Sequence, residues 1–219
     1  ALWGHASFSP NGNTLFSMVC EASPYIREYG IEEPFNLRTI CRCPFSPQTV
    51  VRERSGNIST GSFAGDASTC NTGVYFKPDG TKLFVANHFC YNNPSTANRM
   101  GGVTEWCLEE PWNLQSLKYR THSFASPTAC VIVDLTFSQD GCHMYVTEQC
   151  PGRIYQVNLR EPWDLCTVSN CNLCWICCHL QTCGTCCGIP VHLCGRGIDI
   201  SSNGSLLFVS GSAGQQFYV

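Results

Sequence analysis

Short runs of alternating apolar and polar residues recur along the chain, and pairs of runs are joined by Asp-Gly or Asn-Gly. The clearest pair lies between Asp134 and Val146, on either side of Asp140 and Gly141. Alternation of this kind is typical of half-buried β-strands, and glycine suits a tight turn because it accepts a positive φ. The stretch therefore predicts a β-hairpin, made of a strand A, a two-residue Asp-Gly turn and a strand B.

The same hairpin occurs four times, around Gly12, Gly80, Gly141 and Gly204. Successive turn glycines are 68, 61 and 63 residues apart (80 − 12, 141 − 80 and 204 − 141). A repeat of this length is the sequence signature of an array of similar structural units. The 219 residues are predicted to form one domain, with approximate units 1–68, 69–129, 130–192 and a shorter 193–219.

A second block follows the first three hairpins. It is an alternating run that ends at Glu-Pro and continues through an aromatic residue, Asn or Asp, and Leu, as in Ile26–Leu37, Val103–Leu114 and Ile154–Leu165. Proline lacks the N–H that a sheet ladder needs, so a strand C is expected to end there. Weaker β-like runs then predict a strand D at Thr49–Arg54, Leu117–Phe124 and Leu173–Leu180. The predicted fold is all-β, with four strands per unit.

These two motifs, Phe-Ser-x-Asp-Gly and Pro-Trp-Asp/Asn-Leu, resemble the blades of β-propellers in secreted, surface and phage-associated bacterial proteins. Those blades are similar in turn to the blades of lactonase-like propellers. The resemblance covers nearly the whole chain and implies about three and a half four-stranded antiparallel blades. The chain is then expected to be a mature domain or a piece of a longer protein. Two arrangements stay open: part of a larger ring, completed by further sequence or by a second copy, or a small four-bladed ring.

Composition narrows the possible partners and the compartment. A net charge of −3 gives no basic field, so we expect no nucleic-acid partner. No apolar run approaches the ~18 residues of a membrane-spanning helix, so we expect no membrane span. The 18 cysteines make up about 8% of the chain, which is typical of secreted chains built on disulfides. We therefore expect a secreted protein or one on an extracellular surface.

Four cysteines occupy matching places in two units. Cys70 precedes strand A and Cys90 follows strand B of the second unit, and Cys130 and Cys150 do the same in the third. In a propeller blade, the D–A and B–C connections leave from one face and the A–B and C–D turns from the other. We predict the disulfides Cys70–Cys90 and Cys130–Cys150 on the D–A/B–C face, provided that the Cα atoms lie within ~7 Å.

A dense run of cysteines lies between positions 166 and 194. Its spacing includes two Cys-x-x-Cys pairs, which is the pattern of a four-thiolate zinc site: Cys171, Cys174, Cys183 and Cys186. The competing interpretation is a disulfide knot or a mixture with free thiols, and the pairing within the run stays open.

Polar residues at the ends of strand B, together with a long B–C loop in the second unit, are the candidate binding residues: Asn87, His88, Tyr91, Arg99, Glu148 and Gln149. Loops carried by a rigid scaffold are common binding sites. The sequence therefore favours a non-catalytic binding or scaffold propeller at a cell or particle surface. It would hold a protein or glycan on the D–A/B–C face, without a cofactor and with a second copy or further chain as a partner in the ring.

The alternative function is a lactonase or gluconolactonase-like metal-dependent hydrolase. The resemblance to gluconolactonase-like propellers implies Glu, Asn and Asp side chains around an axial calcium or zinc ion, for which Glu148, Asn87 and Asp199 are the candidates. The sequence has no Gly-x-Ser-x-Gly, phosphate loop or His-Glu-x-x-His. Recurring aromatic residues are instead expected to pack between blades: Tyr29, Phe35, Trp106, Trp112, Tyr155 and Trp163.

Overall fold

The structure is a computed structural model, and it describes residues 6–19, 25–39, 51–52, 71–87, 102–125, 132–148, 154–168, 173–175, 195–211 and 217–218. In these ranges the chain forms β-strands and three short 3-10 helices, with no α-helix, which confirms the predicted all-β class. None of the helices in the described part of the chain is long and apolar enough to cross a bilayer.

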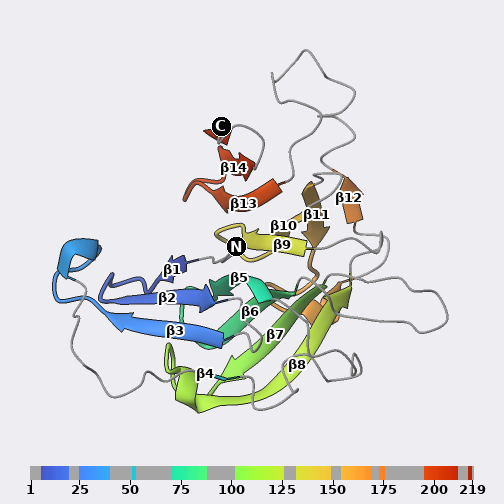
Figure 1. The fold of residues 1–219 in the computed structure, drawn as a ribbon. Coiled ribbons are helices and arrows are strands. Elements are labelled where there is room, and N and C mark those ends of the chain that lie inside the picture. Colours follow the sequence, from blue (N-terminus) through green and yellow to red (C-terminus); the bar gives the residue numbers. More distant parts are fainter. Residues whose placement is uncertain are drawn as a thin grey trace.

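The strands form four antiparallel sheets, each built from consecutive strands (Figure 1). We call them blades 1 to 4. Blade 1 contains β1 (Ala6–Phe8), β2 (Thr14–Val19), β3 (Tyr25–Gly30) and β4 (Val51–Arg52). Blade 2 contains β5 (Asn71–Phe76), β6 (Lys82–Asn87), β7 (Gly102–Leu108) and β8 (Leu117–Ala125). Blade 3 contains β9 (Ile132–Phe137), β10 (His143–Glu148), β11 (Ile154–Asn158) and β12 (Leu173–Trp175). Blade 4 contains β13 (Gly195–Ile200), β14 (Leu207–Gly211) and β15 (Phe217–Tyr218).

The first strand of each blade lies at the inner edge of its sheet. β1 contacts β5, β5 contacts β9, and β9 contacts β13, so the four inner strands form a common hub. The outermost strands β4, β8 and β12 lie away from that hub (Figure 1). Consecutive sheets that fan around their inner strands are the β-propeller arrangement. The predicted fold, with about three and a half blades, is confirmed.

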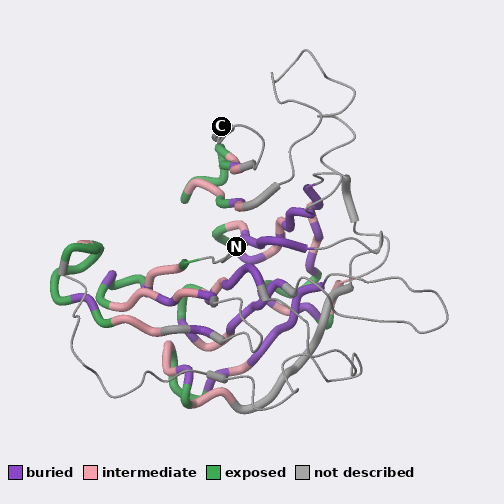
Figure 2. The backbone as a smooth tube through the Cα atoms, viewed as in Figure 1, coloured by how far each residue is buried: buried purple, intermediate pink, exposed green. Residues whose placement is uncertain are grey.

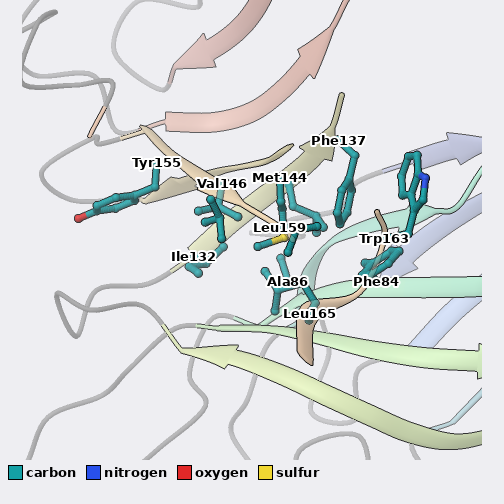
Figure 3. Packing of buried hydrophobic residues seen from close by; sticks show 13 residues of the cluster. Phe84, Ala86, Ile132, Phe137, Met144, Val146, Tyr155, Leu159, Trp163 and Leu165 are labelled. Atoms are coloured by element: carbon teal, nitrogen blue, oxygen red, sulfur yellow. The ribbon is translucent and has the colours of Figure 1, made fainter. Parts of the chain in front are cut away.

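The hydrophobic core is divided into clusters between consecutive blades. Phe16 and Met18 of blade 1 pack with Val74 and Phe76 of blade 2. A second cluster joins blades 2 and 3 (Figure 3), and a smaller one joins blade 3 to Ile198 and its neighbours in blade 4. Figure 2 shows the buried segments running through the middle of the fan. Burial of apolar surface between sheets therefore holds the blades together.

The hairpin turn differs from the predicted two-residue turn. In blade 3 the N–H of Ser138 donates to the carbonyl of His143 at 2.9 Å, which leaves four residues in the loop. Asp140 does not need a positive φ, because its carboxylate accepts the N–H of Cys142 at 3.0 Å and closes a local Asx turn. Only the glycine takes the left-handed conformation, with φ of 72° at Gly141.

The C–D turns contain an unexpected backbone conformation. Phe35, Trp112 and Trp163 have φ of 61°, 65° and 61°, and each begins the approach to a 3-10 helix: η1 (Leu37–Thr39), η2 (Leu114–Ser116) or η3 (Leu165–Thr167). A positive φ is unfavourable for a bulky residue. It persists here because the backbone N–H of each of these aromatic residues donates to the carbonyl of the turn glycine in the same blade, at 3.0 to 3.1 Å. The ring then covers that glycine, where a Cβ would overlap it.

Most of the recurring aromatic residues pack as predicted. Trp112 stacks on Phe16 of blade 1 at a centroid distance of 6.3 Å, and Trp163 stacks on Tyr75 of blade 2 at 5.9 Å. Trp106 and Tyr155 are buried. The prediction is wrong for Phe35, which is 58% exposed because no blade precedes blade 1 in the described chain.

The cysteine predictions fall mainly outside the described residues. Cys70, Cys90, Cys130 and Cys150 lie there, so the two predicted disulfides stay predictions. So do Cys171, Cys183 and Cys186, and for Cys174 only the backbone in β12 is described. Within the described ranges the cysteines with described side chains are free thiols and form no disulfide: Cys107, Cys142 and Cys166.

Candidate functional site

The ends of strand B and the beginnings of strand A meet at one end of the blades. Asn87, the last residue of β6, pairs with Asn71 at the start of β5, and Glu148 in blade 3 pairs with Ile132. Asn87 and Glu148 hold equivalent places, seven residues after their turn glycines (87 − 80 and 148 − 141). Sequence and structure therefore agree that these positions border the D–A/B–C face.

The side chains at this face are only partly described. His88, Tyr91, Arg99 and Gln149 lie outside the described residues, as does the side chain of Asn87. The base of the long B–C loop is described, because Asn87 pairs with Gly102 across β6 and β7. The loop between them is thus anchored at both ends on the sheet.

Glu148 is buried rather than exposed at the mouth of the ring. The hydroxyl of Tyr155 donates to its Oε2 at 3.1 Å, and Tyr155 belongs to the cluster between blades 2 and 3. Beside it, the hydroxyl of Thr72 in blade 2 donates to the carbonyl of Ile132 in blade 3 at 3.1 Å. A buried carboxylate needs hydrogen-bond donors because burial removes its hydration. The described contacts of Glu148 are thus those of a residue within the blade packing.

Asp134 is a buried carboxylate that the sequence analysis did not single out as a site residue. Its Oδ1 accepts the N–H of Leu135 at 2.8 Å, and its Oδ2 accepts the N–H of Ile198 in blade 4 at 3.0 Å. The equivalent position holds Gly73 in blade 2 and Gly197 in blade 4. A Cβ on Gly73 would lie 2.5 Å from Oδ1 of Asp134. The Asp134 side chain therefore occupies the space beside Gly73 and Gly197, and it links β9 to β13 through its hydrogen bond to Ile198.

A second missed carboxylate, Glu105 on β7, bridges blades 2 and 3. Its Oε1 lies 2.7 Å from Nζ of Lys82, and its Oε2 accepts the N–H of Leu165 in η3 at 2.8 Å. Lys82 also donates to the carbonyl of Trp163 at 2.8 Å. We call this group the Lys82–Glu105 latch. It satisfies two backbone groups of the C–D turn of blade 3 with the charged pair of blade 2.

The central position of the inner strands carries Tyr75, Thr136 and Asp199. Thr136 donates to Asp199 Oδ1 at 3.4 Å. Burial, and to a smaller extent the charge of Asp199, raises the pKa of Tyr75 to about 12. These residues form a polar line across blades 2, 3 and 4 at the hub.

The strand register separates Asp199 from Glu148, another candidate of the proposed metal triad. Asp199 lies level with Thr136, which pairs with Tyr145, three residues before Glu148 on β10. At about 3.3 Å per strand residue, this separates Asp199 from Glu148 by ~10 Å along the blade. Within the described ranges no three His, Cys, Asp or Glu side chains are grouped as metal ligands.

We compared the sequence and the fold with those of known proteins. No protein-family model matches the sequence, and no curated relative matches it. Solved structures do match, among them a putative 6-phosphogluconolactonase from Bacteroides fragilis, with a TM-score of 0.54 and 14% identity over 96% of this chain and 47% of that one. A putative 6-phosphogluconolactonase from Bacteroides uniformis gives a TM-score of 0.52 and 13% identity over 94% of this chain and 48% of that one. The Cps50 (Swd1) β-propeller domain of Myceliophteria thermophila gives 0.53 and 14% over 97% and 54%.

These likenesses show the β-propeller fold. The chain spans about half the length of the structures it matches. At such low identity, the activity of a similar structure cannot be transferred to this chain. The resemblance to secreted and phage-associated repeats stays a prediction.

Proposed function

We propose that the chain is a non-catalytic binding or scaffold propeller that acts at a cell or particle surface. It holds a protein or glycan on the face where the D–A and B–C connections leave. The main support is the use of its buried carboxylates. Glu105 and Asp134 each accept a backbone N–H from the following blade, and Glu148 accepts the hydroxyl of Tyr155 within the blade packing. Buried charged groups between and within the blades thus stiffen the fan.

A stiff fan supports binding through its loops. The paired residues Asn87 and Gly102 hold the two ends of the longest B–C loop side by side, which gives Tyr91 and Arg99 a fixed base. An aromatic ring and a guanidinium are suited to a sugar ring or a protein surface, because they combine apolar area with hydrogen-bond donors. The proposed disulfides Cys70–Cys90 and Cys130–Cys150 brace the same face in an oxidising compartment.

The alternative function, a metal-dependent lactonase, is supported by one observation. Its support is that the putative 6-phosphogluconolactonases of two Bacteroides species share the fold. It requires a calcium or zinc site at the axis, and the strand register separates one candidate ligand, Asp199, from another, Glu148.

One experiment compares the two functions. The purified chain is applied to a glycan array and, in parallel, incubated with glucono-δ-lactone with and without Ca²⁺ or Zn²⁺. We expect saturable glycan binding that weakens at least ~10-fold in Tyr91→Ala/Arg99→Ala, because side-chain anchors carry most of the affinity. Gln139→Ala, an exposed residue of the A–B turn on the opposite face, should bind normally. Metal-dependent lactone hydrolysis without glycan binding would overturn the proposal.

A further inference from the structure

The large hydrophobic side chains that stay exposed in the described chain lie on its two end blades. Phe35 and Leu37 of blade 1 are 58% and 54% exposed, and Leu206 and Phe208 of blade 4 are 44% and 37% exposed. Figure 2 shows the corresponding exposed segments, at the turn following β3 and beside β14. Each blade has a front face toward the preceding blade and a back face toward the following one. The exposed residues belong to the front of blade 1 and the back of blade 4.

The repeat shows what covers such residues inside the molecule. Phe84, four residues after its turn glycine, is fully buried on the back of blade 2, 4.5 Å from the ring of Phe137. Phe208 holds the same place after Gly204. On the front of blade 3, Trp163 and Leu165 are buried against blade 2. Phe35 and Leu37 hold the equivalent places after Pro34.

The two open faces are therefore the two halves of one blade–blade interface. At the interior contact, the C–D turn of one blade rests on strand B of the blade before it, where Lys82 donates to the carbonyl of Trp163. Blade 1 has that turn, η1 with Phe35 and Leu37, and blade 4 has that strand, β14 with Phe208 beside Leu206. Both elements are present in one chain, so a second copy can supply each missing half.

We infer that two copies of this chain join head to tail, with the back of blade 4 in one copy against the front of blade 1 in the other. The solved structures that match this chain are about twice its aligned length, since 94–97% of this chain covers 47–54% of theirs. One copy thus corresponds to about half a ring, and a two-fold rotation closes it. The closed ring has eight inner strands, within the usual four to eight blades. Two equal interfaces form at once, and no open face is left to propagate a fibre.

The test is the mass of the chain in solution, by light scattering during size exclusion over a concentration series. We expect twice the 24.2 kDa of one chain, and a non-reducing gel shows whether a disulfide accounts for the dimer. Leu37→Asp and Leu206→Asp each place a carboxylate in both interfaces and should raise the dimer dissociation constant ~100-fold, with unchanged circular dichroism.

Leu206→Lys is the matched control. It introduces at position 206 the residue type found at the equivalent position of blade 2, Lys82, whose amine donates to a carbonyl of the neighbouring turn. This variant should stay dimeric while Leu206→Asp dissociates. A wild-type chain that is monomeric at all concentrations, that forms open polymers, or whose dimer survives both Asp substitutions would overturn the inference. A monomer that is captured by a separate propeller fragment would show that other blades, not a second copy, occupy these faces.

Discussion

At the scale of single residues, the aromatic residue after each Glu-Pro is held in a conformation that its own side chain disfavours. Left-handed backbone costs an L-residue roughly 1–2 kcal/mol. In blade 3 the strain at Trp163 is offset by its hydrogen bond to Gly141 and by burial of the indole against Phe137, at 4.9 Å between centroids. The turn glycine is thus needed twice, for its own positive φ and for the space that the ring occupies.

The two requirements can be separated by alanine substitution. Gly204 also has a positive φ, of 70°, but no described atom lies within 4 Å of an added Cβ. Gly204→Ala should therefore lower the free energy of unfolding only by the cost of the left-handed backbone, about 1–2 kcal/mol. Gly141→Ala should cost ~3 kcal/mol or more, because Trp163 must leave its site as well. Urea unfolding of both variants measures the difference, and equal losses would show that the ring does not rest on the glycine.

Tyr75 makes stability depend on alkaline pH. Its pKa is raised from an ordinary 10.0 to about 12, so the folded state holds the phenol proton more tightly than the unfolded chain. The stabilisation is fully present below pH 10 and is lost as pH rises toward 12. Two pKa units correspond to about 2–3 kcal/mol.

The measurement is the difference in unfolding free energy between wild type and Tyr75→Phe at pH 9 and at pH 11.5. Other groups titrate equally in both proteins, so the gap should shift in favour of Tyr75→Phe at the higher pH. A gap that is the same at both values would place the phenol in water.

The buried carboxylates show how far the role of a single residue can be predicted from the sequence. Glu148 is a candidate because it ends a strand, whereas its described surroundings depend on Tyr155 from the next strand. Asp134 replaces the glycine found at Gly73 and Gly197. Comparing the units position by position for such departures would have found it. Its hydrogen bond to Ile198 could not have been predicted, since it depends on how two sheets stack.

At the scale of elements, the alternation of apolar and polar residues predicts the strands, and proline predicts where they end. The sequence pattern predicts the turns less well. The four-residue A–B loop depends on a side-chain acceptor, Asp140, that serves an N–H two residues on. The 3-10 helices depend on Asn113 and Asp164, which cap the N–H groups of Gln115 and Cys166. Both features use local side-chain chemistry that binary patterning does not report.

The Lys82–Glu105 latch joins an element of one blade to the next. Replacing Glu105 by Ala leaves a largely buried lysine without its anion and the N–H of Leu165 without an acceptor, so stability should fall by about 3–5 kcal/mol. Glu110→Ala is the control, because Glu110 is exposed and its carboxylate accepts a hydrogen bond from the side-chain amide of Asn113 in the same blade; the substitution should cost about 1 kcal/mol or less. Chemical denaturation compares them. A similar small loss in both would mean that the latch does not hold η3.

At the scale of the whole molecule, the core is distributed over the contacts between blades and not within any one of them. A sheet of this kind has two faces to cover, and an interior blade covers both. The end blades leave Phe35, Leu37, Leu206 and Phe208 exposed. Periodicity was sufficient to predict the fan, since each unit repeats the same pattern. Ring closure was not predictable from it, because closure depends on which blade meets the open faces.

The fan itself is tested most directly by amide hydrogen exchange at two positions where a carboxylate of one blade accepts an N–H of the next. These are Ile198, bound to Asp134, and Leu165, bound to Glu105. Both amides should exchange slowly in the wild type. Asp134→Ala should accelerate Ile198 far more than Leu165, and Glu105→Ala should do the reverse. Rapid exchange of both amides in the wild type, or no selective effect of either substitution, would contradict a structure in which the sheets stack blade against blade around a common hub.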